Sequence, residues 1–381
     1  MGAASYEKLP SLPGTLPGPR TLRPRRLPAL LITALALAAT LFYALLSLAP
    51  CMVGRRCYHG YSSRFSFDAD EAAAQNHDGD GDNDGHHRPY SRWMSRIPDA
   101  VNLTSLSIPG THDTMTYALT ADERLQCQNA NLSTQLHAGL RYFDIRARLE
   151  ADELRIYHAD GYTGYTFTDV LLAMFNFLDE NPSEALVMRL KEEGKPIGDA
   201  NTISFEEAFN SYRLSNPDTS PGAKRHLALY DREGPIPTLG ALRSRIFLLQ
   251  NFKSEYDTPY GLAWDGDQMV LEDLWIIPDI YHLADKWTAI RDALEDAATS
   301  PDDNSRLHLA HTSASVGVLP IEAAAGPRNR SVVGMNDMTG QWLHDVFPET
   351  GQGSRTGVVI FDFPGKKLID AVLRWNEPLE R

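Results

Sequence analysis

Five side chains that could move protons or hold a phosphate group lie close together in the sequence. His112 and Asp113 follow one apolar stretch, and Asp144, Arg146 and His158 belong to the next two. An imidazole exchanges protons near neutral pH, and a guanidinium binds two phosphate oxygens at once. A carboxylate can hold an imidazole in one tautomer. These residue types therefore favour acid–base chemistry on a phosphodiester.

Three predicted β-strands position these side chains. Residues 101–108 alternate between apolar and polar types, and we expect this strand to stop at Pro109 and Gly110, which break strand pairing. Residues 140–148 and 154–158 alternate in the same way. The candidate catalytic side chains would therefore lie at or near strand ends.

The second predicted strand separates two sets of side chains. Successive side chains of a strand point to opposite faces of the sheet. Asp144, Arg146 and Arg148 would then share one face, and Phe143 and Ile145 would lie on the other. The two catalytic candidates of this strand, Asp144 and Arg146, are therefore expected side by side.

Beyond these strands the pattern alternates between strand and helix. Further strands are predicted at residues 185–191, 245–250, 269–275, 307–311 and 357–363. Helices are predicted at residues 167–178, 205–212, 281–298, 337–346 and 366–375. About eight strands alternating with helices predict an α/β barrel.

Enzymes built on α/β barrels carry their catalytic residues at the carboxyl ends of the strands. The side chains at or near such ends are His112, Asp113, Arg146, His158, Lys191, Asp273, Trp275 and Asp362. A single histidine at a strand end is more often capped or solvated than catalytic. Two histidines with an arginine between them in the sequence favour the catalytic interpretation.

The composition limits the classes of function. The chain has 381 residues, enough for one large α/β barrel or two ordinary domains. Hydrophobic residues make up 43% and charged residues 23%, as in a globular protein with a substantial core. The net charge of −14 argues against nucleic-acid binding, which needs a basic face. It also argues against electrostatic adsorption of the whole domain to an anionic membrane.

The N-terminal part of the chain predicts a membrane anchor. Residues 1–26 are rich in proline, glycine and serine and end in a cluster of arginines, so we expect a disordered basic tail. Residues 27–49 carry no charge and are long enough to cross a bilayer as one helix. The arginines before this span predict a type II single-pass protein with its catalytic region luminal or extracellular. The alternative is a cleaved signal peptide and a secreted protein.

Residues 50–92 are predicted to form a juxtamembrane and acidic low-complexity linker. The aspartates and the glycine of residues 80–85 match the first positions of a calcium-binding loop. Such a loop needs a glutamate at its twelfth position, which is Ser91 here. We therefore interpret this segment as a solvated spacer that holds the catalytic region, residues 93–381, off the membrane.

The cysteines and the glycosylation sequons are compatible with this topology but do not determine it. Cys51 and Cys57 could form a disulfide bond that leaves Cys127 free, or Cys51 could be lipidated or unpaired at the membrane edge. Three cysteines are too few for a disulfide scaffold and too scattered for a zinc site. Sequons that fit a luminal catalytic region, but also arise by chance, begin at Asn102, Asn131 and Asn329.

Three motifs, in this order, carry a resemblance to a known family: SIPGTHDT at residues 107–114, LRYFDIRAR at residues 140–148 and IYHAD at residues 156–160. They resemble the X-type catalytic region of phosphatidylinositol-specific phospholipase C, in its bacterial-like, single-domain branch. The resemblance extends over residues 93–375. It implies an imperfect TIM (β/α) barrel.

The resemblance also implies roles for the proton-transferring groups. His112 matches the general base that activates the inositol 2-hydroxyl, and Asp362 resembles the carboxylate paired with it. His158 matches the general acid, with Asp113 as its partner near the leaving group. The implied reaction is an intramolecular attack that gives diacylglycerol and an inositol cyclic phosphate.

The resemblance places a guanidinium where related enzymes hold a metal. Arg146 matches the phosphate-binding arginine, and Asp144 helps to orient it. In the calcium-dependent branch of the family, an acid that binds the ion stands at the position of Arg146. We therefore expect no metal and no other cofactor.

Three further residues match substrate-binding positions of the family. Lys191 resembles a lysine that contacts inositol, and Asp273 and Trp275 resemble an acid and a tyrosine beside the inositol ring. The stretch from His311 to Ser315 is expected only to line the site. The implied partner is phosphatidylinositol or a related lipid in a membrane, to which residues 27–49 would anchor the protein.

Two other functions are considered. A related barrel phosphodiesterase that acts on glycerophosphodiesters or choline lipids generally holds a metal through a Glu-x-Asp pattern, and Asp144-Ile145-Arg146 disfavours it. A catalytically silent lipid-head-group binder is the second alternative. Loss of His112 or His158 would have indicated it, and both are present.

Overall fold

The computed structural model describes residues 37, 61–62, 90–230, 234–254, 260–327, 331–350 and 354–380. All of them except Leu37 belong to the unit Gly54–Arg381. The predicted tail, almost all of the predicted span, most of the linker, Cys51, Cys57 and Asn329 lie outside the described residues. Among the described residues, no helix is both long enough and apolar enough to cross a membrane.

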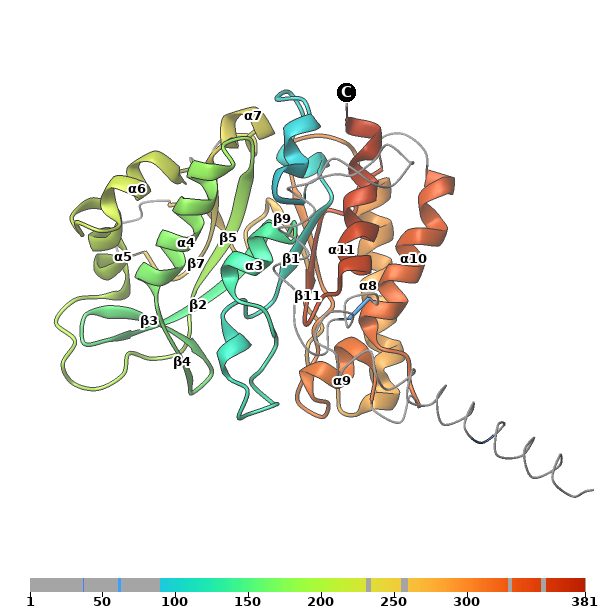
Figure 1. Cartoon of the computed structure of the whole chain (residues 1–381), viewed down its shortest axis with the longest axis horizontal. Helices are drawn as coiled ribbons and strands as arrows, with labels where there is room; N and C mark the ends of the chain where they lie inside the picture. The colour runs from blue at the N-terminus through green and yellow to red at the C-terminus, as the bar shows by residue number, and fades with distance from the viewer. Residues whose placement is uncertain are drawn as a thin grey trace, which may run out of the picture. The chain divides into compact units, whose positions relative to one another are not determined.

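The unit is an α/β fold built on a curled parallel sheet, as the strand–helix alternation predicts (Figure 1). Its main strands neighbour one another in the order β6–β7–β5–β2–β1–β11–β10–β9, and every neighbouring pair is parallel. Within the described residues β6 and β9 do not pair, so the sheet forms an open half-barrel. The strand bounds are β1 Ile108–Thr111, β2 Tyr142–Glu150, β5 Ala185–Glu192, β6 Leu227–Ala228, β7 Arg245–Asn251, β9 Met269–Glu272, β10 Leu307–His311 and β11 Val358–Phe361.

Helices cover the outer face of the sheet, with α4 to α6 over one half and α8, α10 and α11 over the other (Figure 1). The α-helices are α3 Leu132–His137, α4 Phe167–Glu180, α5 Phe205–Leu214, α6 Ser220–His226, α7 Leu239–Leu242, α8 Leu283–Thr299, α9 Pro320–Ala325, α10 Met335–Thr350 and α11 Lys366–Leu373. The 3₁₀ helices are η2 Tyr90–Arg96, η3 Leu103–Ser105, η4 Thr116–Ala118, η5 Ile280–His282 and η6 Arg374–Leu379. The predicted long helices are thus present, and their apolar faces fill the layer between helices and sheet.

The strand predicted at residues 154–158 is not a strand of the barrel. It is β3, Glu153–His158, which pairs antiparallel with β2 and with β4, Gly161–Thr166. Only the turn at Ala151 and Asp152, both with positive φ, separates β2 from β3. A parallel neighbour would need a crossover of about a dozen residues or more. The parallel sheet contains the two-residue strand β6, which the sequence did not predict. Strand β8, Leu262–Ala263, pairs with β7.

The first barrel strand also differs from its prediction. Residues 101–108 do not form a strand, because Leu103–Ser105 is a 3₁₀ helix. The strand is Ile108–Thr111, and it contains Pro109 and Gly110 rather than stopping at them.

The hydrogen-bonding pattern explains why this proline is tolerated. The Ile108 amide donates to the carbonyl of Gly357, the residue before β11, at 2.9 Å, and the His112 amide donates to the Phe361 carbonyl of β11 at 3.0 Å. Pro109, one residue further on from Ile108, therefore has its nitrogen on the side of β2. The Pro109 carbonyl accepts from the Arg141 amide at 2.9 Å, and the first register pair with β2 joins Gly110 to Tyr142. Because Pro109 lies before that first pair, its missing N–H removes no hydrogen bond from the ladder.

Gly110 is required because β2 approaches it closely. A Cβ atom at this position would lie 2.5 Å from Tyr142 Cβ and 2.9 Å from the Tyr142 carbonyl oxygen. We expect Gly110→Ala to lower the free energy of unfolding by about 1–3 kcal/mol, as overpacking of a dense core does. Urea denaturation measures this change. An unchanged midpoint and slope would contradict the assigned close contact.

Two residues of the predicted linker belong to the folded unit. The Gly365 amide donates to the Tyr61 carbonyl at 2.9 Å, and Ser62 forms a β-bridge with Pro364. The Tyr61 side chain is buried against α10, where a Cβ atom on Gly340 would lie 2.2 Å from its ring. Tyr61 and Ser62, here called the N-terminal clip, therefore fasten the chain to the α10–α11 side of the unit.

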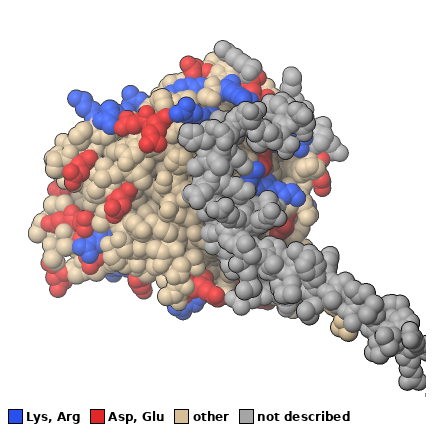
Figure 2. All heavy atoms as spheres, in the orientation of Figure 1, with Lys and Arg blue, Asp and Glu red and all other residues tan. Residues whose placement is uncertain are grey.

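On the face of the molecule in view in Figure 2, Lys and Arg side chains are interspersed with Asp and Glu side chains. The described residues on that face thus do not form the basic surface that nucleic-acid binding needs. Of the two described sequon residues, Asn131 is exposed and Asn102 is half-buried. Asn131 also caps α3, because its side chain accepts a hydrogen bond from the Thr134 amide.

Candidate active site

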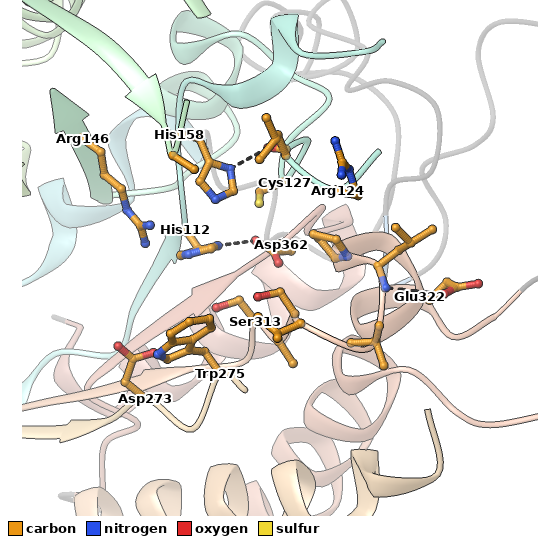
Figure 3. Close-up of a pocket in the computed structure, with 18 of the residues that line it drawn as sticks. His112, Arg124, Cys127, Arg146, His158, Asp273, Trp275, Ser313, Glu322 and Asp362 are labelled. Carbon is orange, nitrogen blue, oxygen red and sulfur yellow. Dashed lines mark hydrogen bonds and ion pairs between the residues drawn. The ribbon is translucent and has the colours of Figure 1, made fainter. Parts of the chain in front are cut away.

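The register of the sheet brings the predicted catalytic residues to one end of the barrel. Thr111 pairs with Phe361, so the next residues, His112 and Asp362, leave neighbouring strands together. The predicted residues that line a single cavity of about 680 Å³ there are His112, Arg146, His158, Lys191, Asp273, Trp275 and Asp362 (Figure 3). The other two predicted residues, Asp113 and Asp144, are buried beside this cavity and contact its lining.

The turn after β1 fixes the position of Asp113. Its φ of 42° lies in the left-handed region, which turns the chain sharply at the strand end. The Asp113 amide donates to Asp144 Oδ2 at 3.2 Å, and the Thr114 amide donates to the Asp144 carbonyl at 3.1 Å. Thr116 Oγ1 donates to the Asp113 carbonyl at 2.7 Å. The carboxylate is therefore held between β1 and β2.

His112 is oriented by Asp362. Its Nδ1 lies 2.9 Å from Asp362 Oδ1, and its Nε2 lies 3.1 Å from Asp113 Oδ2. Gln128 Nε2 donates to the His112 carbonyl at 2.7 Å and to the Phe361 carbonyl at 2.9 Å, which ties the two strand ends together. When Asp362 is ionised and accepts from Nδ1, the ring proton resides there and Nε2 carries a lone pair.

His158 comes from the β3–β4 hairpin rather than from a barrel strand. It is the last residue of β3, before a turn at Ala159 with φ of 49°. Its Nδ1 is 2.8 Å from the Leu125 carbonyl, which can only accept, so Nδ1 donates. Its Nε2 lies 3.2 Å from Asp113 Oδ2. Asp113 therefore contacts the imidazoles of both His112 and His158, whereas the sequence predicted a partnership with His158 alone.

Arg146 is held by carboxylates on two strands. Its Nε lies 3.0 Å from Asp113 Oδ1, and its terminal nitrogen NH2 lies 2.8 Å from Asp144 Oδ2. The other terminal nitrogen, NH1, lies 4.0 Å from Glu193 Oε1 at the cavity wall. Its side chain is 12% exposed, so this guanidinium is a fixed positive charge that faces the cavity.

Burial and close charges shift the pKa values of these groups. Burial, and then the charge of Arg146, lowers the pKa of His112 well below its usual value. Burial raises the pKa of Asp113, and it raises that of Asp362 strongly, with Asp113 adding to the second shift. Burial also disfavours the charge on Asp144, but Arg146 and Arg189 outweigh it and hold the pKa of Asp144 well below its usual value. His112 is therefore neutral at physiological pH, and Asp144 is ionised.

A second guanidinium in the cavity was missed by the sequence analysis. Arg189 stacks on the Trp264 ring, with 3.8 Å between the guanidinium carbon and the ring centroid. It donates to Asn251 Oδ1 from Nε at 3.0 Å and from NH2 at 2.6 Å, and it lies 3.4 Å from Asp144 Oδ1. It precedes Lys191 by two residues on β5, so strand periodicity could have placed both on the same face.

Cys127 and Glu193 also line the cavity without having been predicted. Glu193 forms an ion pair with Lys191 at 2.6 Å. Cys127 is a free, fully buried cysteine, held through its amide by Thr116 Oγ1 and through its carbonyl by the Phe363 amide, both at 3.0 Å. Its stretch of sequence has no periodicity that would have indicated this position.

The stretch from His311 to Ser315 only partly lines the site. Ser313 and Ser315 line the cavity. His311 is completely buried and is not among the lining residues. Its ring meets the His112 ring edge-on, with centroids 5.7 Å apart, and neither of its nitrogens has a hydrogen-bond partner. Burial lowers the pKa of His311 to about 4, so this imidazole is neutral.

Comparisons with known proteins agree with this geometry. A family model described as phosphatidylinositol-specific phospholipase C, X domain, matches residues 106–251. The 1-phosphatidylinositol phosphodiesterase of Listeria monocytogenes is 30% identical over 300 residues, covering 75% of this chain and 85% of that protein. The protein of the same name from Staphylococcus aureus is 29% identical over 181 residues, covering 46% of this chain and 56% of that protein.

Solved structures of phospholipases C have a similar fold. The phosphatidylinositol-specific phospholipase C of Listeria monocytogenes superposes with a TM-score of 0.61 at 29% identity, covering 76% of this chain and 100% of that chain. A mutant of the Staphylococcus aureus phospholipase gives a TM-score of 0.57 at 21% identity, covering 74% of this chain and 98% of that chain. The second likeness, at its lower identity, concerns the fold alone.

Proposed function

Because the chain belongs to the family of phosphatidylinositol-specific phospholipases C, which are phosphoric diester hydrolases, we propose that it cleaves phosphatidylinositol-type lipids by intramolecular attack of the inositol 2-hydroxyl. The products are diacylglycerol and an inositol cyclic phosphate. The observation that carries this proposal is the arrangement of two imidazole Nε2 atoms 3.1 and 3.2 Å from one buried carboxylate oxygen, Asp113 Oδ2.

The two imidazoles suit opposite proton transfers. His112 Nε2, with its lone pair, takes the proton of the 2-hydroxyl while that oxygen bonds to phosphorus. His158 Nε2 gives a proton to the glycerol oxygen while the bond from phosphorus to that oxygen breaks. Asp113 Oδ2 lies 3.2 Å from His158 Nε2 and can accept its hydrogen, and Asp362 can hold the His112 proton on Nδ1. One proton is taken and one is given, so the transfer balances.

Arg146 supplies positive charge for the phosphate. In the transition state, charge develops on the non-bridging oxygens, and a guanidinium that is already fixed in place stabilises it without reorganisation. Asp113 and Asp144 fix Arg146, which leaves NH1 directed towards Glu193 and the cavity. This arrangement supports the proposal that turnover needs no metal.

Exposed apolar side chains lie at the cavity mouth, where a lipid substrate must enter. Leu274, Trp275 and Ile276 follow β9 and are 43%, 46% and 55% exposed, and Val316, in the loop after β10, is 61% exposed. Trp275 and Val316 also line the cavity. Their exposure supports the proposal that they contact the membrane while the head group occupies the cavity.

We expect Trp275→Ala to weaken binding to phosphatidylinositol vesicles by about tenfold, because partial burial of an indole in lipid is worth roughly 1.5 kcal/mol. Vesicle co-sedimentation measures this change. Leu214→Ala is the matched control, since Leu214 is 65% exposed at the end of α5, away from the cavity lining. An equal effect of both substitutions would remove Trp275 from the membrane-contacting role.

The reaction is tested with the full-length protein, phosphatidylinositol vesicles and excess EDTA, with the products followed by phosphorus NMR. The expected product is an inositol cyclic phosphate, formed without added metal. Turnover only after calcium is added would overturn the metal-independent mechanism. No turnover with phosphatidylinositol under either condition would favour another head group or a silent lipid binder, and a lipid panel would separate these two.

A further inference from the structure

Three side chains of the kinds that bind metal ions converge at the catalytic centre. They are His112, Asp113 and Cys127, and one ligand atom from each lies within 4.8 Å of the other two. Cys127, His112 and Asp362 line the same cavity (Figure 3). An ion in the cavity could therefore reach the group without unfolding the turn after β1.

The carboxylate of this group has an unused lone pair. Asp113 Oδ2 is buried and has no hydrogen-bond partner of acceptable geometry, although the Nε2 atoms of His112 and His158 lie 3.1 and 3.2 Å away. His158 donates from Nδ1 to the Leu125 carbonyl, and in the tautomer of His112 that has its proton on Nδ1, beside Asp362, three lone pairs face one another when both rings are neutral. A cation is the species that such a group of acceptors stabilises. In turnover that cation is a proton, and a metal ion can take the same place.

The donor types and spacing fit zinc rather than calcium. Zinc binds imidazole nitrogen, thiolate sulfur and carboxylate oxygen in tetrahedral sites, whereas calcium takes oxygen ligands alone. Tetrahedral bonds of about 2.0–2.1 Å put two ligand atoms about 3.3 Å apart. His112 Nε2 and Asp113 Oδ2 are 3.1 Å apart. They therefore need little movement to bind one ion.

The carboxyl groups of Asp113 and Asp144 are held by guanidiniums, because both contact Arg146 and Asp144 also contacts Arg189. Arg146 contacts Asp113 through Oδ1, which leaves Oδ2 on the side of the imidazoles.

We propose that a zinc-class divalent cation binds through His112 Nε2, Asp113 Oδ2 and Cys127 Sγ and inhibits the enzyme. The Cys127 thiol proton leaves to solvent as the metal–sulfur bond forms, and a water completes the coordination. The ion occupies the lone pair that His112 needs to accept the substrate proton. The metal site goes beyond the proposed function, and only its inhibitory effect rests on the role of His112 as base.

Binding is tested independently of activity with Cd²⁺, which gives an ultraviolet thiolate-to-metal charge-transfer band. The background is the full-length Cys51→Ser/Cys57→Ser variant, which leaves Cys127 as its single cysteine. One equivalent of Cd²⁺ is expected to produce the band, and adding Cys127→Ser is expected to abolish it. In the same background, His112→Gln keeps the thiol and should weaken Cd²⁺ binding by more than about tenfold, since even indirect partners of metal ligands are worth that much. No band in the double variant, or unchanged affinity after His112→Gln, would overturn the site.

Inhibition is tested by adding Zn²⁺ to the same variants during hydrolysis of phosphatidylinositol, with TCEP as reductant. The Zn²⁺ concentration for half-inhibition is expected to rise more than about tenfold when Cys127→Ser is added. The comparison uses each variant's own uninhibited rate, so a change in basal rate does not affect it. Ca²⁺ serves as the control ion and should not inhibit. Equal Zn²⁺ sensitivity with and without Cys127 would overturn the inhibitory role even if Cd²⁺ binds.

Discussion

Replacing His112 with alanine is expected to reduce turnover of phosphatidylinositol by about 10³-fold, because general acid–base catalysis by one side chain typically contributes about 10²–10⁴-fold. The side chain is only 16% exposed but contributes mainly polar contacts to the strand end, so the fold should persist. A release assay for water-soluble inositol phosphate measures the rate, and circular dichroism with a thermal scan checks the fold.

The control for this variant is His344→Ala, since His344 is 65% exposed on α10 and outside the cavity lining. The pH dependence of kcat/KM in the wild-type enzyme tests the same role of His112. A general base must be deprotonated, so kcat/KM should be maximal above the pKa of His112 and should decrease as the pH falls through that pKa. Because burial and Arg146 lower that pKa, the acidic loss should occur below pH 6.5, the unperturbed value. Wild-type turnover by His112→Ala would remove His112 from the role of base.

Replacing Arg146 with alanine is expected to reduce kcat by at least about 10²–10³-fold, the effect of losing one preorganised group that stabilises transition-state charge. It should also lower stability, because buried Asp113 would lose its guanidinium partner and buried Asp144 would keep only Arg189. Arg146→Lys separates the two effects. A lysine keeps the charge and much of the stability, but it cannot present the planar fork of donors that a phosphate binds, so kcat should stay low.

Arg148→Ala is the matched control, because Arg148 lies two residues further along β2 and pairs with the fully exposed Asp160. Its kcat should be near that of the wild type. Added Ca²⁺ should partly restore the Arg146→Ala variant, since two carboxylates then have room for a hard cation. Near-normal kcat in Arg146→Lys would mean that charge alone, and not the guanidinium fork, is what the phosphate requires.

The part of the site that sequence could predict follows from local periodicity. Asp144 and Arg146 share a face of the sheet because they are two residues apart on one strand. On β5, Lys191 pairs with Arg146 in the sheet register and therefore lies beside it. The strand breakers Pro109 and Gly110 and the strand predicted at residues 357–363 placed His112 and Asp362 at or near strand ends, and the parallel register of β1 and β11 joins them. The α/β barrel was predictable for the same reason, because its strands and long helices are regular elements with strong apolar patterns.

Contacts made across the barrel escaped the sequence analysis. His158 was expected on a barrel strand, but the tight turn after β2 makes it part of a hairpin. Arg189 reaches Asn251 and Trp264 only because β5 and β7 are neighbours in the sheet. Cys127 lies in an irregular loop whose path is set by hydrogen bonds to distant backbone. Such contacts depend on tertiary structure, which neither propensity nor period encodes.

The N-terminal clip shortens the linker that would join the predicted membrane span to the catalytic unit. With a membrane span that ends at residue 49, the clip at Tyr61 leaves residues 50–60 as the tether. A fully extended chain covers at most about 3.3–3.6 Å per residue, so this tether reaches about 40 Å, against about 140 Å for one that ran to residue 89. If the predicted span is correct, a tether of this length would keep the catalytic unit within about 40 Å of its own bilayer. The lipid of that bilayer would then have a high effective concentration at the active site, and a second membrane further away would be out of reach.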